Sequence, residues 1–336
     1  TLTSDELVVN GIAGMSSGDD HNALTPITEC DTAAQHVLAS CHSLAQLEDS
    51  LVGDPLEKSV LSAMEWTLTK SDTVIPRRGK RQTLRILHRF YFNSLLKRMS
   101  AVVSCQTPGA MGSSHMVTVK GAAEVLRPMF KELPASYDAV HKYFSLCGAR
   151  VLALGYKSIP ELSGQELREL PRETAESELE FAGFLVVSCP LKRDSKPLIK
   201  TIKESSHHVM MITGDNPLTA CHVAKQLGIT SLPVVQLVNT SQGNDASSDD
   251  DWRWECPDGS PSPYPDVWPQ KGIRQLTSTH QLCLTGPALS YLQTCKSRRY
   301  GDLLQDILPH VSVFARVAPK QKELVITTLK QQGFTT

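Results

Sequence analysis

The stretch MMITGDNPLTACHVAKQLGI, from Met210 to Ile229, decides the fold class of the C-terminal half of the chain. An apolar run ends in Thr-Gly-Asp at positions 213–215, and an amphipathic run begins after Asn216 and Pro217. This order predicts a buried strand, a short loop and a helix with an asparagine N-cap and a proline in its first turn. Loops at the carboxyl ends of strands are where open α/β sheets bind ligands.

The same order of elements repeats through the C-terminal half. The strand-like runs FAGFLVVS, HHVMMIT, QLCLTG and VSVFAR each precede a run with helical spacing. Apolar strands that alternate strictly with helices predict a doubly wound parallel sheet with helices on both faces. We assign the strand-like run at residues 6–14 to this sheet as its first strand.

The region between these parts follows a different pattern. Helical spacing begins near Asp31 and Pro55, and the strand-like runs LRILHRFYF, MSAVVSC, HMVTVKG and RVLALGYK follow without regular alternation. Such a mixture favours an α+β domain. We therefore predict a discontinuous sheet domain, residues 1–14 and 179–336, that is interrupted by an inserted α+β domain, residues 15–178.

Residues 239–272 interrupt the alternation a second time. The segment is rich in Asp, Ser, Pro and Gly, which predicts a flexible surface insertion within the sheet domain. Its Trp252, Trp254 and Trp268 either form a partner-binding patch or pin a variable loop, and the composition favours the second interpretation.

Composition argues against several classes of protein. The chain has 34 Lys and Arg against 35 Asp and Glu, a net charge of -1 that gives no support for nucleic-acid binding. An odd number of cysteines without a CxxC motif favours a reducing compartment over a disulfide framework. No apolar run reaches the roughly 18 residues that cross a bilayer. His36, Cys41 and His42 do not have the spacing of zinc ligands, and we predict no metal site within the chain.

Polar residues gather at two predicted strand ends of the sheet domain. Thr213 is suited to donate a hydrogen bond to a phosphoryl oxygen, and Gly214 permits close backbone approach and unusual dihedrals. Asp215 is suited to orient a nucleotide hydroxyl or a neighbouring cationic side chain. Arg316 ends another strand, and Lys322, six residues later, is placed to neutralise phosphate charge. The alternative interpretation is a plain turn before a capped helix. It explains Asn216 and Pro217 but does not explain why Gly214 and Asp215 precede them.

The inserted domain offers weaker signals for a nucleotide. Phe92 lies five residues before Lys97, a pairing in which an aromatic ring stacks on a base and a lysine reaches phosphate. Lys120 ends a predicted strand before a helix. Each signal alone is weak, because an aromatic residue on a strand usually belongs to the core.

Taken in order, these stretches resemble the cytoplasmic catalytic region of P-type ATPases over almost the whole chain. The opening TLT resembles the tail of the phosphorylation motif Asp-Lys-Thr-Gly-Thr-Leu-Thr. The further matching stretches are GDPLEKS, FYFNSLLKRMS, VKGAAE, GARVLALGY, MITGDNPLTA and FARVAPKQKELVI.

The resemblance implies a haloacid-dehalogenase-like phosphorylation domain with an inserted nucleotide-binding domain, and it implies ATP and Mg²⁺ as cofactors. The intact enzyme would autophosphorylate on an aspartate just upstream of Thr1, so we expect the chain alone to be inactive. It implies catalytic roles for Thr213, Gly214, Asp215 and Lys322, and ATP-binding roles for Glu57, Phe92, Lys97, Lys120, Gly121, Arg150, Lys192, Asp215 and Arg316.

One departure from the family pattern points to a branch. Most members have Asp-Pro-Pro-Arg where this chain has Cys-Pro-Leu-Lys, residues 189–192, so that Lys192 keeps the positive charge without the carboxylate. Together with GDPLEKSVLSAMEW, this stretch most resembles the endoplasmic reticulum subtype of the type V branch. The resemblance implies a dislocase of misinserted transmembrane helices in that membrane, with this region on the cytosolic side and the membrane and actuator domains elsewhere in the polypeptide. The alternatives are a cation or polyamine transporter and a non-catalytic nucleotide-binding module. A soluble phosphatase would not need the inserted domain.

Overall fold

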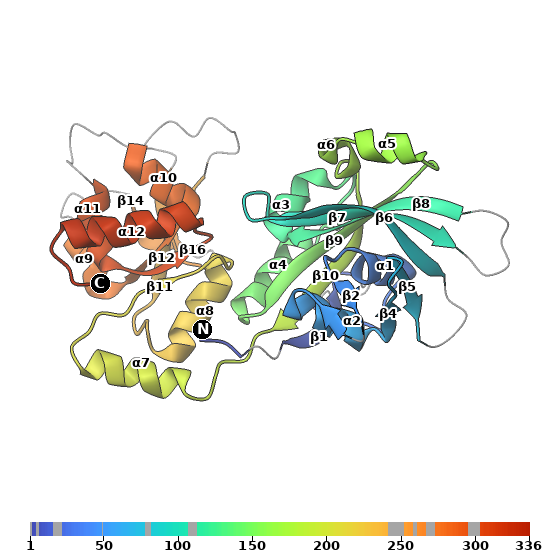
Figure 1. Ribbon diagram of the computed structural model, residues 1–336. Coiled ribbons are helices and arrows are strands. Elements are labelled where there is room, and N and C mark those ends of the chain that lie inside the picture. The colour runs from blue at the N-terminus through green and yellow to red at the C-terminus, as the bar shows by residue number, and fades with distance from the viewer. Residues whose placement is uncertain are drawn as a thin grey trace. The chain divides into compact units, whose positions relative to one another are not determined.

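The chain is seen in a computed structural model that describes residues 2–4, 7–15, 22–48, 50–77, 82–106, 113–240, 252–257, 261–266, 273–294 and 303–336. It divides into two compact units, and we describe each by itself (Figure 1). Unit 1 comprises residues 3–144 and 149–190, and unit 2 comprises residues 145–148 and 191–336 together with Leu2. Both units mix helices with strands, as predicted.

Unit 1 is built on an eight-stranded sheet in the order β1-β10-β9-β8-β7-β6-β5-β4. All neighbouring strands in it are antiparallel. A separate ribbon is formed by β2 (Ala45–Leu47) and β3 (Ser50–Val52). The strands of the large sheet are β1 (Val8–Ala13), β4 (Trp66–Leu68), β5 (Thr73–Pro76), β6 (Thr83–Asn93), β7 (Arg98–Gln106), β8 (Ser113–Ala122), β9 (Arg150–Ile159) and β10 (Glu180–Ser188).

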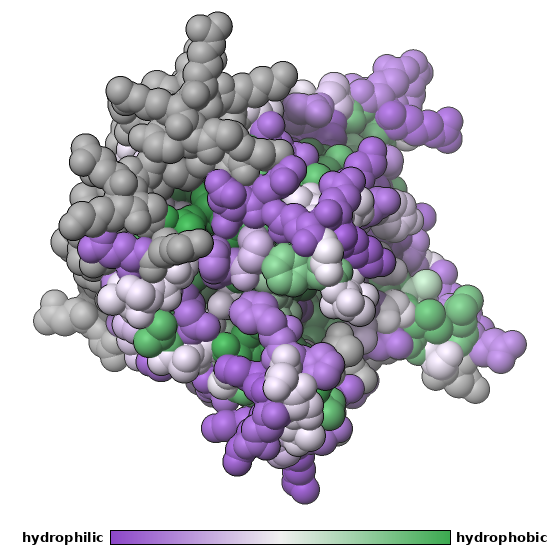
Figure 2. Space-filling model, turned by 90° about the vertical axis from the view of Figure 1, so that its left-hand side faces the viewer, coloured by the Kyte–Doolittle hydropathy of each residue, from purple (hydrophilic) through white to green (hydrophobic). Residues whose placement is uncertain are grey.

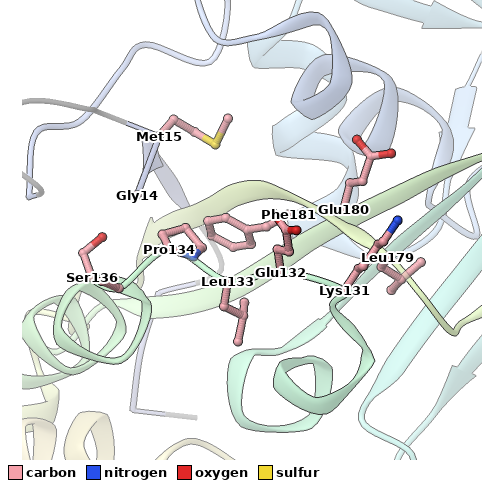
Figure 3. A pocket seen from close by; sticks show the side chains of 11 residues that line it. Gly14, Met15, Lys131, Glu132, Leu133, Pro134, Ser136, Leu179, Glu180 and Phe181 are labelled. Atoms are coloured by element: carbon pink, nitrogen blue, oxygen red, sulfur yellow. The ribbon is translucent and has the colours of Figure 1, made fainter.

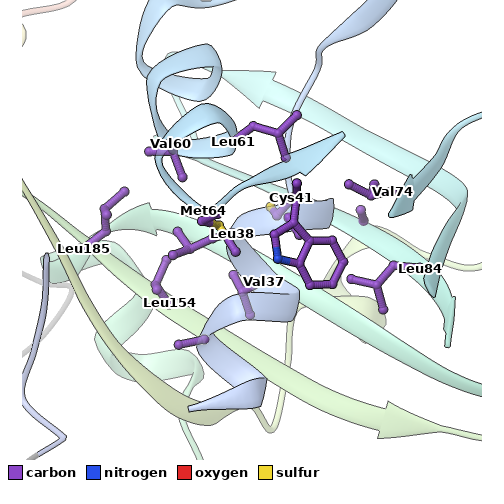
Figure 4. Close-up of a cluster of buried hydrophobic side chains, with 14 of the residues drawn as sticks. Val37, Leu38, Cys41, Val60, Leu61, Met64, Val74, Leu84, Leu154 and Leu185 are labelled. Carbon is purple, nitrogen blue, oxygen red and sulfur yellow. The ribbon is translucent and has the colours of Figure 1, made fainter. Parts of the chain in front are cut away.

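Helices cover both faces of the sheet of unit 1 (Figure 1). On one face, Val37 and Leu38 pack with Val60, Leu61 and other buried side chains in a large apolar cluster (Figure 4). A second cluster fills the other face. The first face is covered by α1 (Thr32–Ser40) and α2 (Pro55–Ala63), the second by α3 (Ala123–Leu126) and α4 (Tyr137–Leu146), and the short helices η1 (Arg127–Met129), α5 (Gly164–Glu169) and α6 (Arg172–Ala175) complete the unit.

The placement of two predicted strands in a parallel sheet was wrong. Residues 6–14 and the run FAGFLVVS correspond to β1 and β10, which pair antiparallel with each other in unit 1. The predicted boundaries 14/15 and 178/179 therefore do not follow the compact units. The reason lies in burial: on β10, Leu185 and Val187 face one apolar cluster while Phe184 and Val186 face the other. A strand buried on both faces loses its polar alternation and looks like a strand of a parallel sheet.

Unit 2 has a six-stranded sheet in the order β11-β16-β15-β12-β13-β14. The first four strands in this order are parallel to one another. The fifth strand, β13, pairs antiparallel with both of its neighbours, β12 and β14. The predicted parallel alternation is thus confirmed for HHVMMIT, QLCLTG and VSVFAR, whereas β12 was missed. The strands are β11 (Met211–Ile212), β12 (Val234–Asn239), β13 (Trp252–Glu255), β14 (Pro261–Asp266), β15 (Gln281–Thr285) and β16 (Val311–Ala315).

Helices also pack on both faces of this second sheet. One face is covered by α7 (Ser195–Glu204) and α8 (Pro217–Leu227), and the other by α9 (Ile273–Thr279), α10 (Gly286–Thr294), α11 (Leu303–Ile307) and α12 (Pro319–Gln331), with η3 (Leu308–His310) before β16. On the coloured part of the face in Figure 2, hydrophobic residues form small areas between hydrophilic ones.

The prediction of a flexible insertion at residues 239–272 was wrong for its described part. Trp252 and Trp254 lie on β13, are 7% and 1% exposed, and belong to the main apolar cluster of unit 2. The indole of Trp252 also stacks on Tyr291, with ring centres 4.5 Å apart. Neither tryptophan is therefore available as a partner-binding patch. Trp268 lies outside the described residues.

Three further features concern the described part of the chain. Its cysteines are free thiols: Cys41, Cys105, Cys221 and Cys283 are among the buried ones, and Cys147 is exposed. None of its helices is long and apolar enough to cross a membrane. No group of three or more His, Cys, Asp or Glu side chains in it is arranged to hold a metal ion.

Candidate nucleotide and phosphate sites

The carboxyl ends of β11 and β16 form the candidate phosphate site of unit 2. These strands are parallel neighbours, so the loops that follow them lie at the same edge of the sheet. The amide of Thr213 donates to the carbonyl of Phe314 at 2.8 Å, and the amide of Arg316 donates to the carbonyl of Asp215 at 3.0 Å. A guanidinium nitrogen of Arg316 also donates to the carbonyl of Gly214 at 3.1 Å. Four predicted site residues are thus brought together.

Hydrogen bonds within the loop after β11 hold its polar groups in place. The hydroxyl of Thr213 donates to a carboxylate oxygen of Asp215 at 3.2 Å and accepts from the amide of Asp215 at 3.1 Å. The side chain of Asn216 accepts from the amide of Leu218 at 2.9 Å, which confirms the predicted N-cap of α8. Gly214 does not adopt a positive φ, and a Cβ atom there would meet nothing within 4 Å. Open space at this position, rather than an unusual dihedral, is what the loop offers to a ligand.

Arg316 has a backbone conformation that non-glycine residues rarely adopt. Its φ is 54°, in the left-handed region. The backbone and guanidinium bonds to the loop of Asp215 and Gly214 hold it there. Strained residues of this kind concentrate at ligand sites, which favours a functional role for this strand end.

A third strand end joins this edge, and the sequence reasoning missed it. A Cβ atom on Gly286, which follows β15, would lie 2.7 Å from the carbonyl oxygen of Arg316, so only glycine fits. The side-chain nitrogen Nε2 of Gln321 donates to the carbonyl of Gly286 at 2.8 Å, and its side-chain oxygen Oε1 accepts from the backbone amide of Ala318 at 3.0 Å. A signal was present, because LTG at residues 284–286 repeats the Thr-Gly ending of ITG at residues 212–214.

The two candidate lysines of unit 2, Lys192 and Lys322, have no described contact with the loop after β11. Lys322 is half-buried and is the fourth residue of α12, directly after the anchored Gln321. No residue in the described part of the chain forms an ion pair with its ammonium group. Lys192 is exposed, and its amide donates to the carbonyl of Leu2 at 3.1 Å. None of its described contacts joins it to the loop after β11.

In unit 1 the structure pairs two of the predicted nucleotide-binding residues. Glu57, in the first turn of α2, is 7% exposed, and Lys120, on β8, is 6% exposed. The ammonium of Lys120 donates to a carboxylate oxygen of Glu57 at 3.1 Å, and the other oxygen accepts from the amide of Ser43 at 2.9 Å. Acids and lysines are rarely this buried unless they are paired, and here each is the other's partner.

His42 lies beside this ion pair and is kept neutral. It is 2% exposed, and its Nδ1 accepts from the amide of Leu44 at 3.2 Å. Burial lowers its pKa to about 3, and the positive charges of Lys120 and Arg89 act in the same direction. The surroundings of the Glu57–Lys120 pair therefore carry the cations of Lys120 and Arg89 without a further charge from the histidine.

The hairpin between β6 and β7 carries Phe92 and Lys97. Phe92 is 59% exposed, which rules out the core role that an aromatic strand residue usually has. The carbonyl of Lys97 accepts from the amide of Ala122 at 3.0 Å. A Cβ atom on Gly121 would lie 2.9 Å from that carbonyl oxygen and 2.5 Å from the side chain of Leu126, so the close approach requires glycine. The turn is thus packed on the residues that follow Lys120.

The remaining candidate residue and a hollow on the surface of unit 1 lie apart from the residues described so far. Arg150 is half-buried at the start of β9, opposite Val187 of β10. A hollow of about 720 Å³ is lined by residues 131–136, Met15 and Phe181 among others, and Figure 3 shows their side chains around it. No predicted nucleotide-binding residue lines this hollow.

The chain is similar in sequence to known proteins over almost its whole length. No family model matches the chain. It is 40% identical over 334 residues to a probable manganese-transporting ATPase, PDR2, of Arabidopsis thaliana. The matched region covers 99% of this chain and 26% of that protein. It is 37% identical over 349 residues to the endoplasmic reticulum transmembrane helix translocase of Schizosaccharomyces pombe, covering 100% of this chain and 27% of that protein. It is 27% identical over 366 residues to the polyamine-transporting ATPase 13A2 of Homo sapiens, covering 98% of this chain and 30% of that protein.

The relatives that are 37–40% identical over the full chain are P-type ATPases, and the chain belongs to this family. Within the family it is most similar to the type V members, which include the endoplasmic reticulum transmembrane helix translocases and PDR2. The chain spans about a quarter of the length of these relatives, 26% of the Arabidopsis thaliana protein and 27% of the Schizosaccharomyces pombe protein.

Proposed function

We propose that the chain is the nucleotide-binding and phosphoryl-transfer region of a P-type ATPase that hydrolyses ATP as an intact protein. The observation that carries this proposal is the junction of Thr213, Asp215 and Arg316 at the carboxyl ends of parallel strands. In the intact protein, this edge would receive the γ-phosphoryl group of ATP, and an aspartate just upstream of Thr1 would accept it.

The two units divide the work in this proposal. Unit 2 is the phosphorylation domain with a haloacid-dehalogenase-like sheet, and unit 1 is the nucleotide-binding domain. The Glu57–Lys120 pair and Phe92 hold the adenine end, while Arg316 and Lys322 neutralise the phosphate end. Phosphoryl transfer depends mainly on positioning and on charge neutralisation, so it needs few reactive side chains.

ATP would bring Mg²⁺ with its phosphates. At the phosphate edge, the described residues offer the Asp215 carboxylate and the Thr213 hydroxyl, both hard oxygen ligands that suit this ion. They do not form a complete magnesium site by themselves. What the chain's own residues supply is the orientation of the loop and the positive charge around it.

For the parent protein we propose an endoplasmic reticulum transmembrane helix translocase, with this region on the cytosolic side. The supporting observation is similarity over the full chain to translocases of three fungi at 37–38% identity. Cation transport is the second candidate, because the probable manganese-transporting ATPase PDR2 is 40% identical. Polyamine transport is a weaker one at 27% identity. Cargo would be bound by the membrane domain of the same polypeptide.

Calorimetric titration of ATP into the chain tests the nucleotide site. We expect weak binding, and Phe92→Ala should lose about 1–3 kcal/mol of it, because a stacked base contributes that much. Leu95→Ala is the matched control, since Leu95 is exposed in the same hairpin. Equal affinity of Phe92→Ala and the unaltered chain would remove Phe92 from the site. If the full gene lacks Asp-Lys-Thr-Gly before Thr1, the alternative of a non-catalytic nucleotide-binding module holds instead.

A further inference from the structure

A buried carboxylate in unit 1 is bonded to the hairpin of β6 and β7. Glu176 directly follows α6 and is 1% exposed. One of its oxygens accepts from Nε of Arg98 at 2.6 Å. The other accepts from Nε of Arg172 at 2.9 Å and from the hydroxyl of Ser100 at 2.8 Å. A single acid thus joins an arginine of α6 to two residues of β7.

Arg172 extends this network to both strands of the hairpin. One terminal nitrogen of its guanidinium donates to the carbonyl of Arg98 at 2.9 Å, and the other donates to the carbonyl of Tyr91 at 3.3 Å. The guanidinium carbon also lies 5.9 Å from the ring centre of Phe90, within the range of a cation–π contact. Arg172 is therefore hydrogen-bonded to the backbone both before and after the turn at residues 94–97.

The tip of the hairpin is held by two hydrogen bonds to Asn93, one to its side chain and one to its carbonyl. The side chain of Asn93 accepts from the amide of Leu95 at 2.8 Å, and the carbonyl of Asn93 accepts from the amide of Lys97 at 2.7 Å. Tyr91 and Phe92 remain exposed. The orientation of the exposed Phe92 therefore depends on the backbone that Arg172 fixes.

We propose that Arg98, Glu176 and Arg172 are positioning residues that set the orientation of Phe92 and Lys97 for an adenine ring. The inference rests on the proposed function. Buried ion networks are weak contributors to stability compared with apolar packing, whereas removal of one member leaves uncompensated charge. The described hydrogen bonds of this network end on the hairpin and on α6, so its role is to select one hairpin geometry. Arg172 would act through backbone carbonyls and would not touch the nucleotide.

Arg172→Lys is the discriminating variant. Lysine keeps the charge beside Glu176, but a single ammonium cannot reproduce the planar fork that reaches two carbonyls. We expect ATP and adenosine to bind about tenfold more weakly, the size of a lost base-stacking contact, and tripolyphosphate to bind equally well. Amide hydrogen exchange at Leu95 should become faster. Arg127→Lys is the matched control, because Arg127 makes a comparable forked bond to Asp138 on an exposed surface of the same unit.

A double variant separates the outcomes. If Arg172 acts through Phe92, the combination of Phe92→Ala with Arg172→Lys should bind ATP no more weakly than Phe92→Ala alone. Losses that add, or an Arg172→Lys chain that binds adenosine normally, would overturn the positioning role. A Phe92→Ala chain with normal affinity would instead remove the proposed site. Should Arg172→Lys fail to fold, Ser100→Ala removes one donor to Glu176 without changing charge and must show the same selective loss for adenosine.

Discussion

At the scale of single residues, the most informative feature is the buried pair of Glu57 and Lys120. Each side chain is almost completely removed from water, and each has a charged partner at 3.1 Å. An ion pair in such a place does little for stability compared with apolar residues of the same size. The pair is part of the proposed nucleotide site, and its own contribution to stability can be measured directly.

Removal of one member of this pair should be severe. Lys120→Ala leaves the carboxylate of Glu57 buried without its cation, and we expect the free energy of unfolding of unit 1 to fall by about 3–5 kcal/mol. Urea titration followed by circular dichroism measures this loss. Lys70→Ala is the control, since Lys70 is exposed in the same unit and its removal should change stability by less than about 0.5 kcal/mol. Similar stability of both variants would contradict the buried pair.

His42 should make unit 1 sensitive to acid. Its pKa is lowered from 6.5 to about 3 in the folded chain, by burial first and then by Lys120 and Arg89, while the carboxylate of Asp72 opposes this. Between these two values the unfolded chain binds more protons than the folded one, so stability must fall as the pH falls from 6.5 towards 3. His42→Asn should flatten this part of the curve of unfolding free energy against pH. An unchanged slope would show that His42 is protonated in the folded chain.

At the scale of helices and strands, the sequence predicted elements better than their partners. Apolar runs located β10, β15 and β16 correctly, because burial alone produces such runs. They did not reveal that β10 pairs in the antiparallel sheet, since Phe184 and Leu185 face two different apolar clusters. Pairing depends on distant residues that local composition does not encode.

The candidate sites show the same limit. The strand ends with Thr213 and Arg316 were predicted, because a polar ending on an apolar strand is a local signal. The contribution of Gly286 was missed, since only the fold shows that the carbonyl of Arg316 lies 2.7 Å from where a Cβ atom would be. The Glu176 network was also missed, as its members are spread over 79 positions of sequence, from Arg98 to Glu176.

The tryptophans of β13 give a prediction at this scale. A polar, glycine-rich and proline-rich setting predicted a flexible surface insertion, yet Trp254 is 1% exposed within the apolar cluster of unit 2. Trp254→Ala should lower the free energy of unfolding by about 3–5 kcal/mol, as large-to-small core substitutions of aromatic residues do. Thermal melting of the variant checks this. Leu198→Ala, at an exposed position of α7, is the apolar control and should leave the melting temperature almost unchanged.

At the scale of the whole molecule, the proposed reaction requires both units and the rest of the polypeptide. In the intact ATPase, Lys322→Ala should slow phosphoenzyme formation by about 10² to 10³, the effect of removing one preorganised contact to transition-state charge. ATP affinity should change little, because such a contact acts on the transition state rather than on ground-state binding. The rate of acid-stable, hydroxylamine-sensitive labelling from γ-labelled ATP measures the first effect, and equilibrium titration measures the second.

Asp215→Asn should behave differently in the same assay. It keeps the shape of the loop but removes a negative charge close to the phosphates, so ATP should bind as well or better while transfer slows. Labelling of the Lys322→Ala protein at the normal rate would contradict a catalytic role for Lys322 and leave it as a solvated residue of α12.

The buried thiols provide a reporter for each unit without any engineering. Burial raises the pKa of Cys41 to about 12 and that of Cys105 to about 11, so the folded chain holds almost no reactive thiolate at these positions near neutral pH. In unit 2, a hydrogen bond between the free thiols of Cys283 and Cys221, together with burial, raises the pKa of Cys283 as well. Brief exposure to an alkylating reagent followed by mass spectrometry therefore counts opening events of unit 1 and unit 2 separately, while the exposed Cys147 records the total dose of reagent.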